Sequence, residues 1–268
     1  MTIGFLGAGK MAEAIAASLV QSDLSTPWEV LACDKSPERC ALMAKQYGVA
    51  VTDDVAQTVK ECKVLVLAVK PQDLDALLAS VRPLLTEKHL LVSIAAGKTL
   101  ATLRRVAGAK ARVVRVMPNL ALMVQEGMSV YCAAKNAKPA DKKLVAQIFG
   151  GAGAVLELPE RHFDAVTALS GSGPAFFAYV VQAMIEGAAA LKLPKDAARL
   201  LAEQTLIGTG IYLQNTGRDI GEFIQAVTSP KGTTAAGLAV LEKGGAVKKA
   251  LAATLAAAAA RSAELSKA

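Results

Sequence analysis

Four hydroxyl side chains lie within one short segment, residues 226–238, which reads AVTSPKGTTAAGL. The four residues are Thr228, Ser229, Thr233 and Thr234. Pro230 and Gly232 lie among them, and an alanine-rich stretch typical of a helix follows. A helix N-terminus needs one capping hydroxyl, or two at most. We therefore expect the extra hydroxyls to form a cradle for a small, polar and anionic ligand.

A glycine-containing turn opens the chain within residues 2–20, TIGFLGAGKMAEAIAASLV. The pattern Gly7-x-Gly9-x-x-Ala12 follows an apolar run and precedes an amphipathic stretch. In a dinucleotide-binding turn the first glycine allows the tight turn, and the second lets a pyrophosphate approach the backbone. The third small residue allows the helix to pack closely on the strand. Asp34 ends the next apolar run at the usual distance, so this context predicts a bound dinucleotide.

The residues around Asp34 give conflicting indications about which dinucleotide binds. A carboxylate at this position holds the ribose 2′-hydroxyl of NAD and repels a 2′-phosphate. Lys35, Ser36 and Arg39 follow at once, and cations with a hydroxyl suit the 2′-phosphate of NADP. We favour NADP(H), with NAD(H) as the alternative, because three groups suited to a phosphate are in reach if Asp34 points away.

Two further apolar runs end in residues that border a ligand crevice if the sheet is parallel. The segment AVKPQD, residues 68–73, places Pro71 at the start of a helix, and RVMPN, residues 115–119, ends in Asn119. Asn119 either bonds to the carboxamide or the substrate, or it is ordinary turn chemistry after a proline. The residues expected to contact the cofactor are Gly7, Gly9, Lys10, Met11, Asp34, Lys35, Ser36, Ala68, Val69, Lys70, Pro71 and Asn119.

Short apolar runs alternate with amphipathic stretches through the first half of the chain. The expected strands are residues 2–6, 28–33, 63–69, 89–95 and 112–117. The expected helices are residues 10–20, 37–47, 72–82 and 99–107. This alternation predicts crossover connections, and therefore a parallel sheet covered by helices on both faces. A last strand–helix–strand set, residues 127–132, 140–149 and 153–157, is expected to complete the sheet.

After about residue 160 the runs rich in valine and isoleucine disappear. Long stretches rich in alanine and leucine replace them at residues 173–191, 195–214 and 246–265. The fold class is therefore predicted as α/β, with an N-terminal Rossmann-type doubly wound sheet followed by an all-helical C-terminal domain. We expect residues 1–159 to bind the dinucleotide and residues 160–268 to serve substrate binding and dimerisation.

Composition excludes several classes of protein. The chain has 268 residues, with 53% hydrophobic and 4% aromatic residues and a formal net charge of +7. The charge is spread along the chain without a basic tail or interleaved aromatic residues, which argues against a nucleic-acid partner. A core of small side chains favours an oligomer. Residues 250–260, the longest uncharged Ala/Leu stretch, are too short to span a bilayer, so no membrane contact is expected.

The cysteines and histidines do not form a recognisable site. Their positions, Cys33, Cys40, Cys62, Cys132, His89 and His162, show no metal-ligand or disulfide spacing. The N-terminal apolar run has no basic region before it and ends at Gly7, which is unlike a signal peptide. We expect a reduced, cytoplasmic protein that binds no metal.

The segment ALSGSGPAFFAYVV, residues 168–181, indicates the type of bond that reacts. Ser170 and Ser172 offer capping hydroxyls before Pro174. In the β-hydroxyacid dehydrogenases a similar turn, G-x-x-G-x-G-x-x-x-K, carries a lysine that acts as acid and base for an alcohol. Phe177 occupies the position of that lysine. Because alcohol oxidation needs a base and hydride addition to a protonated imine needs no strong acid, the segment favours C=N chemistry.

The segments taken together resemble the Δ1-pyrroline-5-carboxylate reductase family. GFLGAGKMA, AVKP, VRVMPN, SGSGPAF and VTSPKGTTAAGL occur in the family's order and spacing and extend over essentially the whole chain. The resemblance implies NAD(P)H-dependent reduction of 1-pyrroline-5-carboxylate to L-proline, the last step of proline biosynthesis. It also implies a helical C-terminal domain that interlocks two chains, often within a ring of dimers.

The resemblance assigns the hydroxyl-rich segment to the substrate, a small imino acid. The substrate carboxylate is expected against Ser229 and the backbone N–H groups of Gly232, Thr233 and Thr234. Thr234 matches the threonine whose hydroxyl lies near the ring nitrogen, and it is the expected catalytic residue. Each hydrogen bond to the carboxylate is charge-assisted and contributes about 1.5–3 kcal/mol. Holding the ring in this way would aim its C5 at the nicotinamide.

Two positions depart from the family pattern, and alternatives remain open. Leu120 stands where the family has threonine, which removes a hydroxyl beside the cofactor or substrate. Lys231 stands where a small residue is common, and it adds positive charge near the carboxylate unless it is solvated. The alternatives to the family reaction are reduction of a related cyclic imino acid, such as the six-membered homologue, and a non-catalytic dinucleotide-binding sensor.

Overall fold

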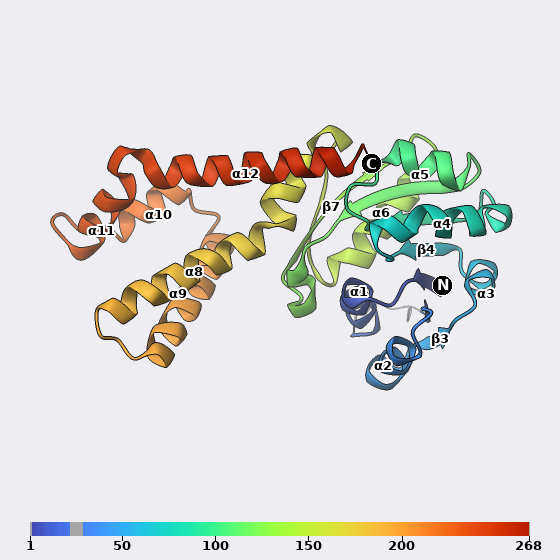
Figure 1. Ribbon diagram of the computed structural model, residues 1–268, viewed down its shortest axis with the longest axis horizontal. Helices are drawn as coiled ribbons and strands as arrows, with labels where there is room; N and C mark the ends of the chain where they lie inside the picture. The colour runs from blue at the N-terminus through green and yellow to red at the C-terminus, as the bar shows by residue number, and fades with distance from the viewer. Residues whose placement is uncertain (1, 22–28, 268) are drawn as a thin grey trace. The chain divides into compact units, whose positions relative to one another are not determined.

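The computed structural model describes residues 2–21 and 29–267 (Figure 1). The chain divides into two compact units. The first contains the residues up to Ser172 together with those from Ala258 onward, and the second is Gly173–Ala257. The position of Trp28, the first residue of a predicted strand, lies outside the described residues.

The first unit is built on one eight-stranded sheet with the strand order β3-β2-β1-β4-β5-β6-β7-β8. The strands are β1 (Thr2–Leu6), β2 (Glu29–Cys33), β3 (Ala50–Thr52), β4 (Val64–Leu67), β5 (Leu90–Ser93), β6 (Arg112–Met117), β7 (Gly127–Ala133) and β8 (Gly153–Glu157). Strands β1 to β6 are parallel and follow the Rossmann order 3-2-1-4-5-6. The predicted Rossmann-type sheet is therefore confirmed.

The sheet is not parallel throughout, because β7 pairs with β6 in the antiparallel direction. The link from Met117 to Gly127 is too short for a helical crossover, which needs about a dozen residues or more. Helix α6 (Pro139–Gly150) is the crossover connection from β7 to β8, and β8 therefore pairs parallel to β7. The strand–helix–strand set predicted at the end of the domain does complete the sheet.

Helices cover both faces of the sheet. They are α1 (Lys10–Gln21), α2 (Pro37–Tyr47), α3 (Val55–Glu61), α4 (Pro71–Val81), α5 (Leu100–Ala107) and α6 (Pro139–Gly150). Side chains alternate along β4, so Val64 and Val66 join one buried cluster while Leu65 and Leu67 join the other. The first cluster includes residues of α1 and α6, and the second includes residues of α4 and α5. A strand buried on both faces explains why its sequence is almost wholly apolar.

Two short elements of the first unit are absent from the sequence prediction. Strand β3 has three residues, none of them buried, so it shows no apolar run. Helix α3 has seven residues and is capped by Asp54, whose carboxylate accepts hydrogen bonds from the N–H groups of Ala56 and Gln57 at 2.8 and 3.0 Å. Both elements are too short for a periodic pattern to be visible.

Helical structure begins earlier than predicted before the second unit. Helix α7 (Phe163–Val166) continues into a π-helical turn at Thr167–Gly171, whereas the sequence placed the first helical residue at 173. The hydroxyl of Ser170 donates to the Val166 carbonyl at 3.1 Å, so Ser170 is not the cap that its position predicted. Met117 of β6 packs so closely on Gly171 that a Cβ there would lie 2.5 Å from its Cε.

The second unit is entirely helical, which confirms the second half of the predicted fold class. Its helices are α8 (Gly173–Ala190), α9 (Lys195–Thr216), α10 (Ile220–Ala226), α11 (Thr233–Glu242) and most of α12 (Ala246–Leu265). Helix α10 was not predicted. The rings of Tyr212 and Phe223 pack in a tilted arrangement with their centroids 5.1 Å apart, and this contact joins α9 to α10.

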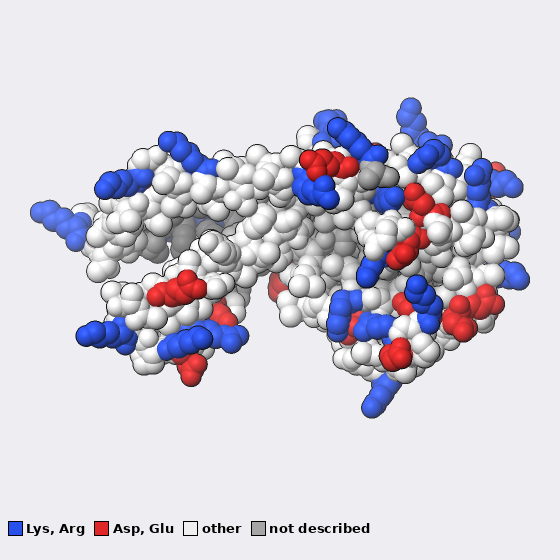
Figure 2. Space-filling view, viewed as in Figure 1, with Lys and Arg blue, Asp and Glu red and all other residues white. Residues whose placement is uncertain are grey.

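The second unit buries little of its own apolar surface. Gly173 and Ala198 are the only buried residues between Gly173 and Ala257. Large apolar side chains such as Tyr179, which is 73% exposed, lie open on the helices. The middle of α12 carries no charged residue, and this stretch is white in Figure 2. Open apolar surface of this extent indicates that another chain covers it.

One helical run, Glu160–Ala190, is long and apolar enough to cross a membrane by length and composition, with a mean hydropathy of 1.3. Only 11% of its most apolar window is buried. This run was not predicted from the sequence as a membrane candidate. A helix that packs into a subunit interface has the same composition, so this property is weak support for a membrane segment.

Candidate active site

The carboxyl ends of three neighbouring strands meet at one edge of the sheet. The register places Leu6 of β1 between Cys33 of β2 and Leu67 of β4. The turns that follow these residues are therefore neighbours: the N–H of Gly7 donates to the Cys33 carbonyl, and the N–H of Ala68 donates to the Leu6 carbonyl, both at 2.8 Å. This arrangement brings three segments that are distant in sequence to one place, as predicted for a doubly wound sheet.

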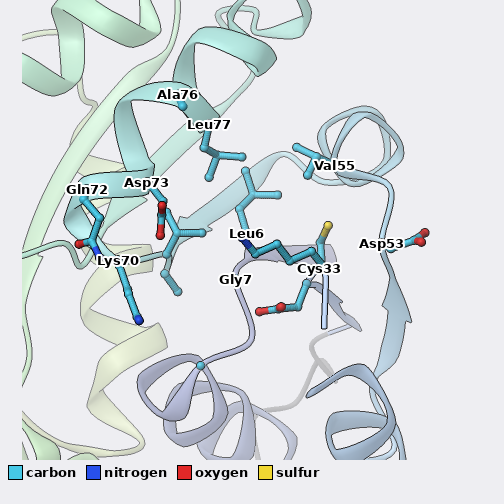
Figure 3. Close-up of a pocket in the computed structure, with 15 residues that line it drawn as sticks. Leu6, Gly7, Cys33, Asp53, Val55, Lys70, Gln72, Asp73, Ala76 and Leu77 are labelled. Atoms are coloured by element: carbon cyan, nitrogen blue, oxygen red, sulfur yellow. The ribbon is translucent and has the colours of Figure 1, made fainter. Parts of the chain in front are cut away.

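A pocket of about 500 Å³ lies at this edge (Figure 3). Its lining includes seven of the predicted cofactor contacts, namely Gly7, Gly9, Asp34, Lys35, Ala68, Val69 and Lys70. Figure 3 shows residues of the β4–α4 segment on one side of Gly7 and residues at the ends of β2 and β3 on the other. Lys10, Met11, Ser36, Pro71 and Asn119 do not line the pocket, and their contacts with a cofactor remain predictions.

The β1–α1 turn depends on glycine for close packing and for open space. Gly7 has a φ of 101°, and a Cβ at this position would lie 2.8 Å from the carbonyl carbon and oxygen of Ala68. A side chain at Gly7 would therefore push the two turns apart. At Gly9 no heavy atom lies within 4 Å of the place where a Cβ would stand, so a ligand can approach the backbone closely. Helix α1 begins directly after it, at Lys10.

Both oxygens of the Asp34 carboxylate accept a hydrogen bond from the backbone. One oxygen accepts from the N–H of Ala8 at 2.7 Å, and the other accepts from the N–H of Ser36 at 2.9 Å. Asp34 therefore joins the glycine turn to the loop after β2. It lines the pocket at the same time, so its negative charge still acts on whatever binds there.

Of the three groups that the sequence offered to a 2′-phosphate, Lys35 alone lines the pocket and is exposed. The Ser36 hydroxyl donates to Glu38 at 2.6 Å and accepts from the N–H of Arg39 at 3.2 Å, which caps α2. The guanidinium of Arg39 binds the Ala8 carbonyl and the Glu13 carboxylate instead. Of these three predicted groups, only Lys35 therefore offers its side chain to the pocket.

Eight lining residues were not predicted from the sequence. They are Leu6, Cys33, Asp53, Val55, Gln72, Asp73, Ala76 and Leu77. Asp53 and Val55 follow the short strand β3, which left no signal in the sequence. Cys33 ends a predicted strand, so the strand-end rule could have found it. Burial raises the pKa of its thiol above the ordinary value, which keeps the sulfur protonated and apolar in character.

The region after β6 is held by its own hydrogen bonds. The side-chain oxygen of Asn119 accepts from the N–H of Met128 at 3.1 Å. Leu120, the residue that replaces the family's threonine, is 60% exposed. Both ring nitrogens of His89 have partners within the fold: one faces the Val59 carbonyl at 3.0 Å, and the other accepts from the N–H of Thr86 at 2.9 Å.

The hydroxyl-rich segment of the second unit connects α10 to the N-terminus of α11. The N–H of Gly232 donates to the Ser229 carbonyl at 3.0 Å and closes a turn. A Cβ on Gly232 would collide with the Ser229 hydroxyl, so only glycine leaves that hydroxyl in place. Lys231 has a left-handed φ of 62° and is exposed. Thr228 donates back to the Ile224 carbonyl at 2.6 Å and completes the end of α10.

Helix α11 begins without a side-chain cap. Gly232 precedes its first residue and offers no hydroxyl. The hydroxyls of Ser229, Thr233 and Thr234 have no hydrogen-bond partner among the described residues. The first intrahelical bond runs from the N–H of Ala236 to the Gly232 carbonyl, which leaves the preceding N–H groups of the first turn for a ligand. Free N–H groups, hydroxyls and the helix dipole together favour an anion such as a carboxylate.

Within residues 2–21 and 29–267, no three side chains of His, Cys, Asp or Glu are grouped as a metal ion requires. Of the four cysteines, Cys33, Cys62 and Cys132 are buried thiols. Among the described residues, the pocket of the first unit and the uncapped helix end of the second are the places where sequence-predicted site residues gather.

Comparisons with known proteins match both units. A family model described as pyrroline-5-carboxylate reductase dimerisation matches residues 160–265, and one described as NADP oxidoreductase coenzyme F420-dependent matches residues 2–97. The pyrroline-5-carboxylate reductase of Glycine max is 40% identical over 265 residues, which are 99% of this chain and 96% of the relative. That of Methanosarcina acetivorans is 40% identical over 91% of this chain and 90% of the relative.

Solved structures agree with the sequence relatives. The pyrroline-5-carboxylate reductase of Coxiella burnetii has a TM-score of 0.93 at 32% identity, with 99% of this chain and 98% of that chain covered. The pyrroline carboxylate reductase of Plasmodium falciparum, solved with NADP bound, has a TM-score of 0.87 at 28% identity with the same coverage.

Proposed function

Because the chain belongs to the pyrroline-5-carboxylate reductase family, we propose that the pocket at β1, β2 and β4 binds the cofactor and that the uncapped end of α11 binds the imino acid. The chain is an NAD(P)H-dependent enzyme that reduces the C=N bond of 1-pyrroline-5-carboxylate to form L-proline. The observation that best supports the proposed site is the N-terminus of α11, where three hydroxyls and the first N–H groups have no partner among the described residues.

The cofactor is NADP(H), with NAD(H) as the alternative. We place its pyrophosphate at Gly7 and Gly9, where the backbone is open, and its 2′-phosphate at Lys35. Residues of the β4–α4 turn, including Lys70, border the same pocket. When bound, the reduced nicotinamide supplies the hydride, and the protein's part is to hold and orient the two reactants.

The end of α11 is assigned to the carboxylate of the imino acid. Ser229 and the N–H groups of Gly232, Thr233 and Thr234 fit this role, with Gly232 leaving the space that the Ser229 hydroxyl occupies. Gly232 also uses its N–H within the turn, so the N–H groups of Thr233 and Thr234 carry most of the contact. The hydroxyl of Thr234 is assigned to the ring nitrogen, where it steadies the protonated imine as the hydride arrives at C5.

The proposed reaction needs no lysine as a general acid. Hydride addition turns a protonated imine into a neutral amine, and this amine becomes an ammonium ion when it takes up a proton from solvent. Phe177 stands where related dehydrogenases carry a lysine, and its side chain is 61% exposed. The reaction therefore relies on positioning and hydrogen bonding more than on proton transfer by a side chain.

The chain self-associates through its helical region, which matches the dimerisation family. We propose that residues 160–268 form the substrate-binding and dimerisation domain and that residues 1–159 form the cofactor domain. The partner chain would cover the apolar faces of α8 and α12, and the dimers would assemble further into a ring. This burial would account for the apolar run Glu160–Ala190 without a membrane, in an enzyme of the cytoplasm.

The test of this function is turnover measured on two substrates. Oxidation of NADPH should depend on added 1-pyrroline-5-carboxylate and yield L-proline in equal amount. The six-membered homologue should react more slowly, because the carboxylate contact is fixed while the longer ring shifts the C=N bond. Faster turnover of the six-membered ring would assign the chain to that substrate, and cofactor binding without any imine reduction would indicate a sensor.

A further inference from the structure

A buried carboxylate lies behind the glycine turn. Glu13 of α1 is 3% exposed, although an ionised side chain is rarely buried without partners. It accepts hydrogen bonds from Arg39 at 2.7 Å and from Tyr47 at 3.0 Å, and Lys10 approaches it to 3.4 Å. Arg39 and Tyr47 both belong to α2, so the Glu13 carboxylate links α1 to α2.

The same Arg39 also holds the backbone of the turn. Its Nε donates to the carbonyl oxygen of Ala8 at 2.6 Å. The N–H of Ala8 is held from the other side by Asp34 at 2.7 Å. The two peptide groups that flank the Ala8 Cα are therefore fixed by one guanidinium and one carboxylate. Bonds to charged groups are stronger than bonds between neutral ones, so the orientation of both peptides is well determined.

The bond to Ala8 determines where the next N–H points. In a trans peptide the carbonyl and the N–H of the following residue point in opposite directions. Arg39 holds the Ala8 carbonyl on the side of the turn that faces α2. The N–H of Gly9 therefore points away from α2. Gly9 lines the pocket and has open space beside it, whereas neither Ala8 nor Arg39 lines the pocket.

We propose that Arg39, held in place by Glu13, is a positioning residue that orients the N–H of Gly9 toward the pyrophosphate of the cofactor. The inference rests on the proposed function in one respect, that a dinucleotide binds on this turn. It reassigns Arg39, which the sequence offered as a ligand for the 2′-phosphate. Two of the N–H donors of Arg39 are already bound to Ala8 and Glu13, and Arg39 does not line the pocket, whereas Lys35 does.

The two roles of Arg39 make different predictions because NADH has the pyrophosphate but lacks the 2′-phosphate. We would titrate the full-length protein with NADPH and with NADH, without substrate, and follow nucleotide fluorescence. For Arg39→Met we expect the dissociation constants of both nucleotides to rise by the same factor, about tenfold. Lys35→Met provides the contrast, since it should weaken NADPH and leave NADH unchanged.

Further variants guard against a general loss of structure. Arg39→Lys should recover part of the affinity for both nucleotides, because an ammonium can reach one of the two partners. Glu13→Gln should weaken both by a smaller factor, because Gln still offers an oxygen to Arg39 and Tyr47. Arg199→Met removes an exposed ion pair with Glu203 and should leave both dissociation constants unchanged.

Two results would overturn the proposal. One is that Arg39→Met, or Arg39→Lys if the first variant does not fold, weakens NADPH alone as Lys35→Met does. The other is that it changes neither dissociation constant. The titration requires no turnover, so a wild-type protein that binds both nucleotides but reduces no imine would contradict the proposed function and leave this result standing.

Discussion

The carboxylate of Asp34 accepts a hydrogen bond from the N–H of Ala8 at 2.7 Å, and this bond ties the end of β2 to the glycine turn. Its second oxygen accepts from the N–H of Ser36, so the group that usually binds an NAD ribose already has two backbone partners. We therefore expect cofactor choice in this chain to depend on the charge of Asp34 and on the cation of Lys35, which both line the pocket.

Replacing Asp34 with Asn should shift the cofactor preference toward NADPH. Removal of a negative charge at the pocket wall favours the 2′-phosphate, and we expect the NADPH-to-NADH affinity ratio to rise about fivefold. NADH itself should bind less well, because the amide NH₂ of Asn faces an N–H donor and loosens the turn. Titration with both nucleotides measures the ratio, and an unchanged ratio would show that the charge of Asp34 is not felt at the ribose.

Replacing Thr234 with Ala should lower kcat about a hundredfold and leave the dissociation constant of NADPH nearly unchanged. The hydroxyl has no partner among the described residues, so its removal disturbs no internal bond and acts on the substrate alone. Steady-state kinetics with saturating NADPH measures this effect, and Thr234→Ser should restore part of the rate.

Thr228→Ala is the matched control for Thr234. The Thr228 hydroxyl lies in the same segment but donates to the Ile224 carbonyl at 2.6 Å, at the C-terminal end of α10. Its removal should lower stability by about 1 kcal/mol and leave kcat close to the wild-type value. Equal losses of activity in the two variants would argue that the whole segment, and not the Thr234 hydroxyl, supports the reaction.

The protein should sediment as a dimer or a larger assembly at micromolar concentration. Between Gly173 and Ala257 a single chain buries only two residues, too few to stabilise the helices alone. Tyr179→Glu, which places a charge on the open face of α8, should shift the protein toward monomer. Lys60→Glu on α3 is the control and should not. A wild-type monomer would contradict this account of the helical region.

Glu13 should make folding stability depend on pH in the acid range. Burial raises the pKa of its carboxyl, but the bonds from Arg39 and Tyr47 lower it more, so the pKa lies below the ordinary 4.5. A carboxyl whose pKa falls on folding stabilises the protein above the ordinary value, and this contribution is lost as the pH drops through the folded pKa. Below pH 4.5 the Tm of the wild type should therefore fall more steeply than that of Glu13→Gln. Parallel curves in thermal unfolding would exclude this role.

Features that depend on neighbouring residues in the sequence were predicted well. The glycine turn, the parallel direction of β1, β2, β4, β5 and β6, and the helix start after Gly232 each follow from short patterns with a physical cause. Strand β3 was missed because three residues at the sheet edge show no alternation. Asp53 and Val55, which line the pocket beside it, were missed for the same reason.

Features that depend on packing could not be predicted. Glu13 and Arg39 are 26 residues apart, and only the contact of α1 with α2 brings them together. Without that contact, Arg39 resembled a phosphate ligand because it follows Lys35 and Ser36. The early helical start before Gly173 was hidden by two serines and two glycines that read as a cap, whereas the Ser170 hydroxyl turns back to Val166.

The most direct measurement is a crystal structure of the protein with NADP⁺ and L-proline bound together. We predict that the proline carboxylate accepts hydrogen bonds from Ser229 and from the N–H groups of Thr233 and Thr234, with C5 of its ring facing the nicotinamide of a dinucleotide seated on Gly7 and Gly9. A proline bound elsewhere, or held at α11 beyond hydride-transfer distance from the nicotinamide in every subunit, would contradict the account.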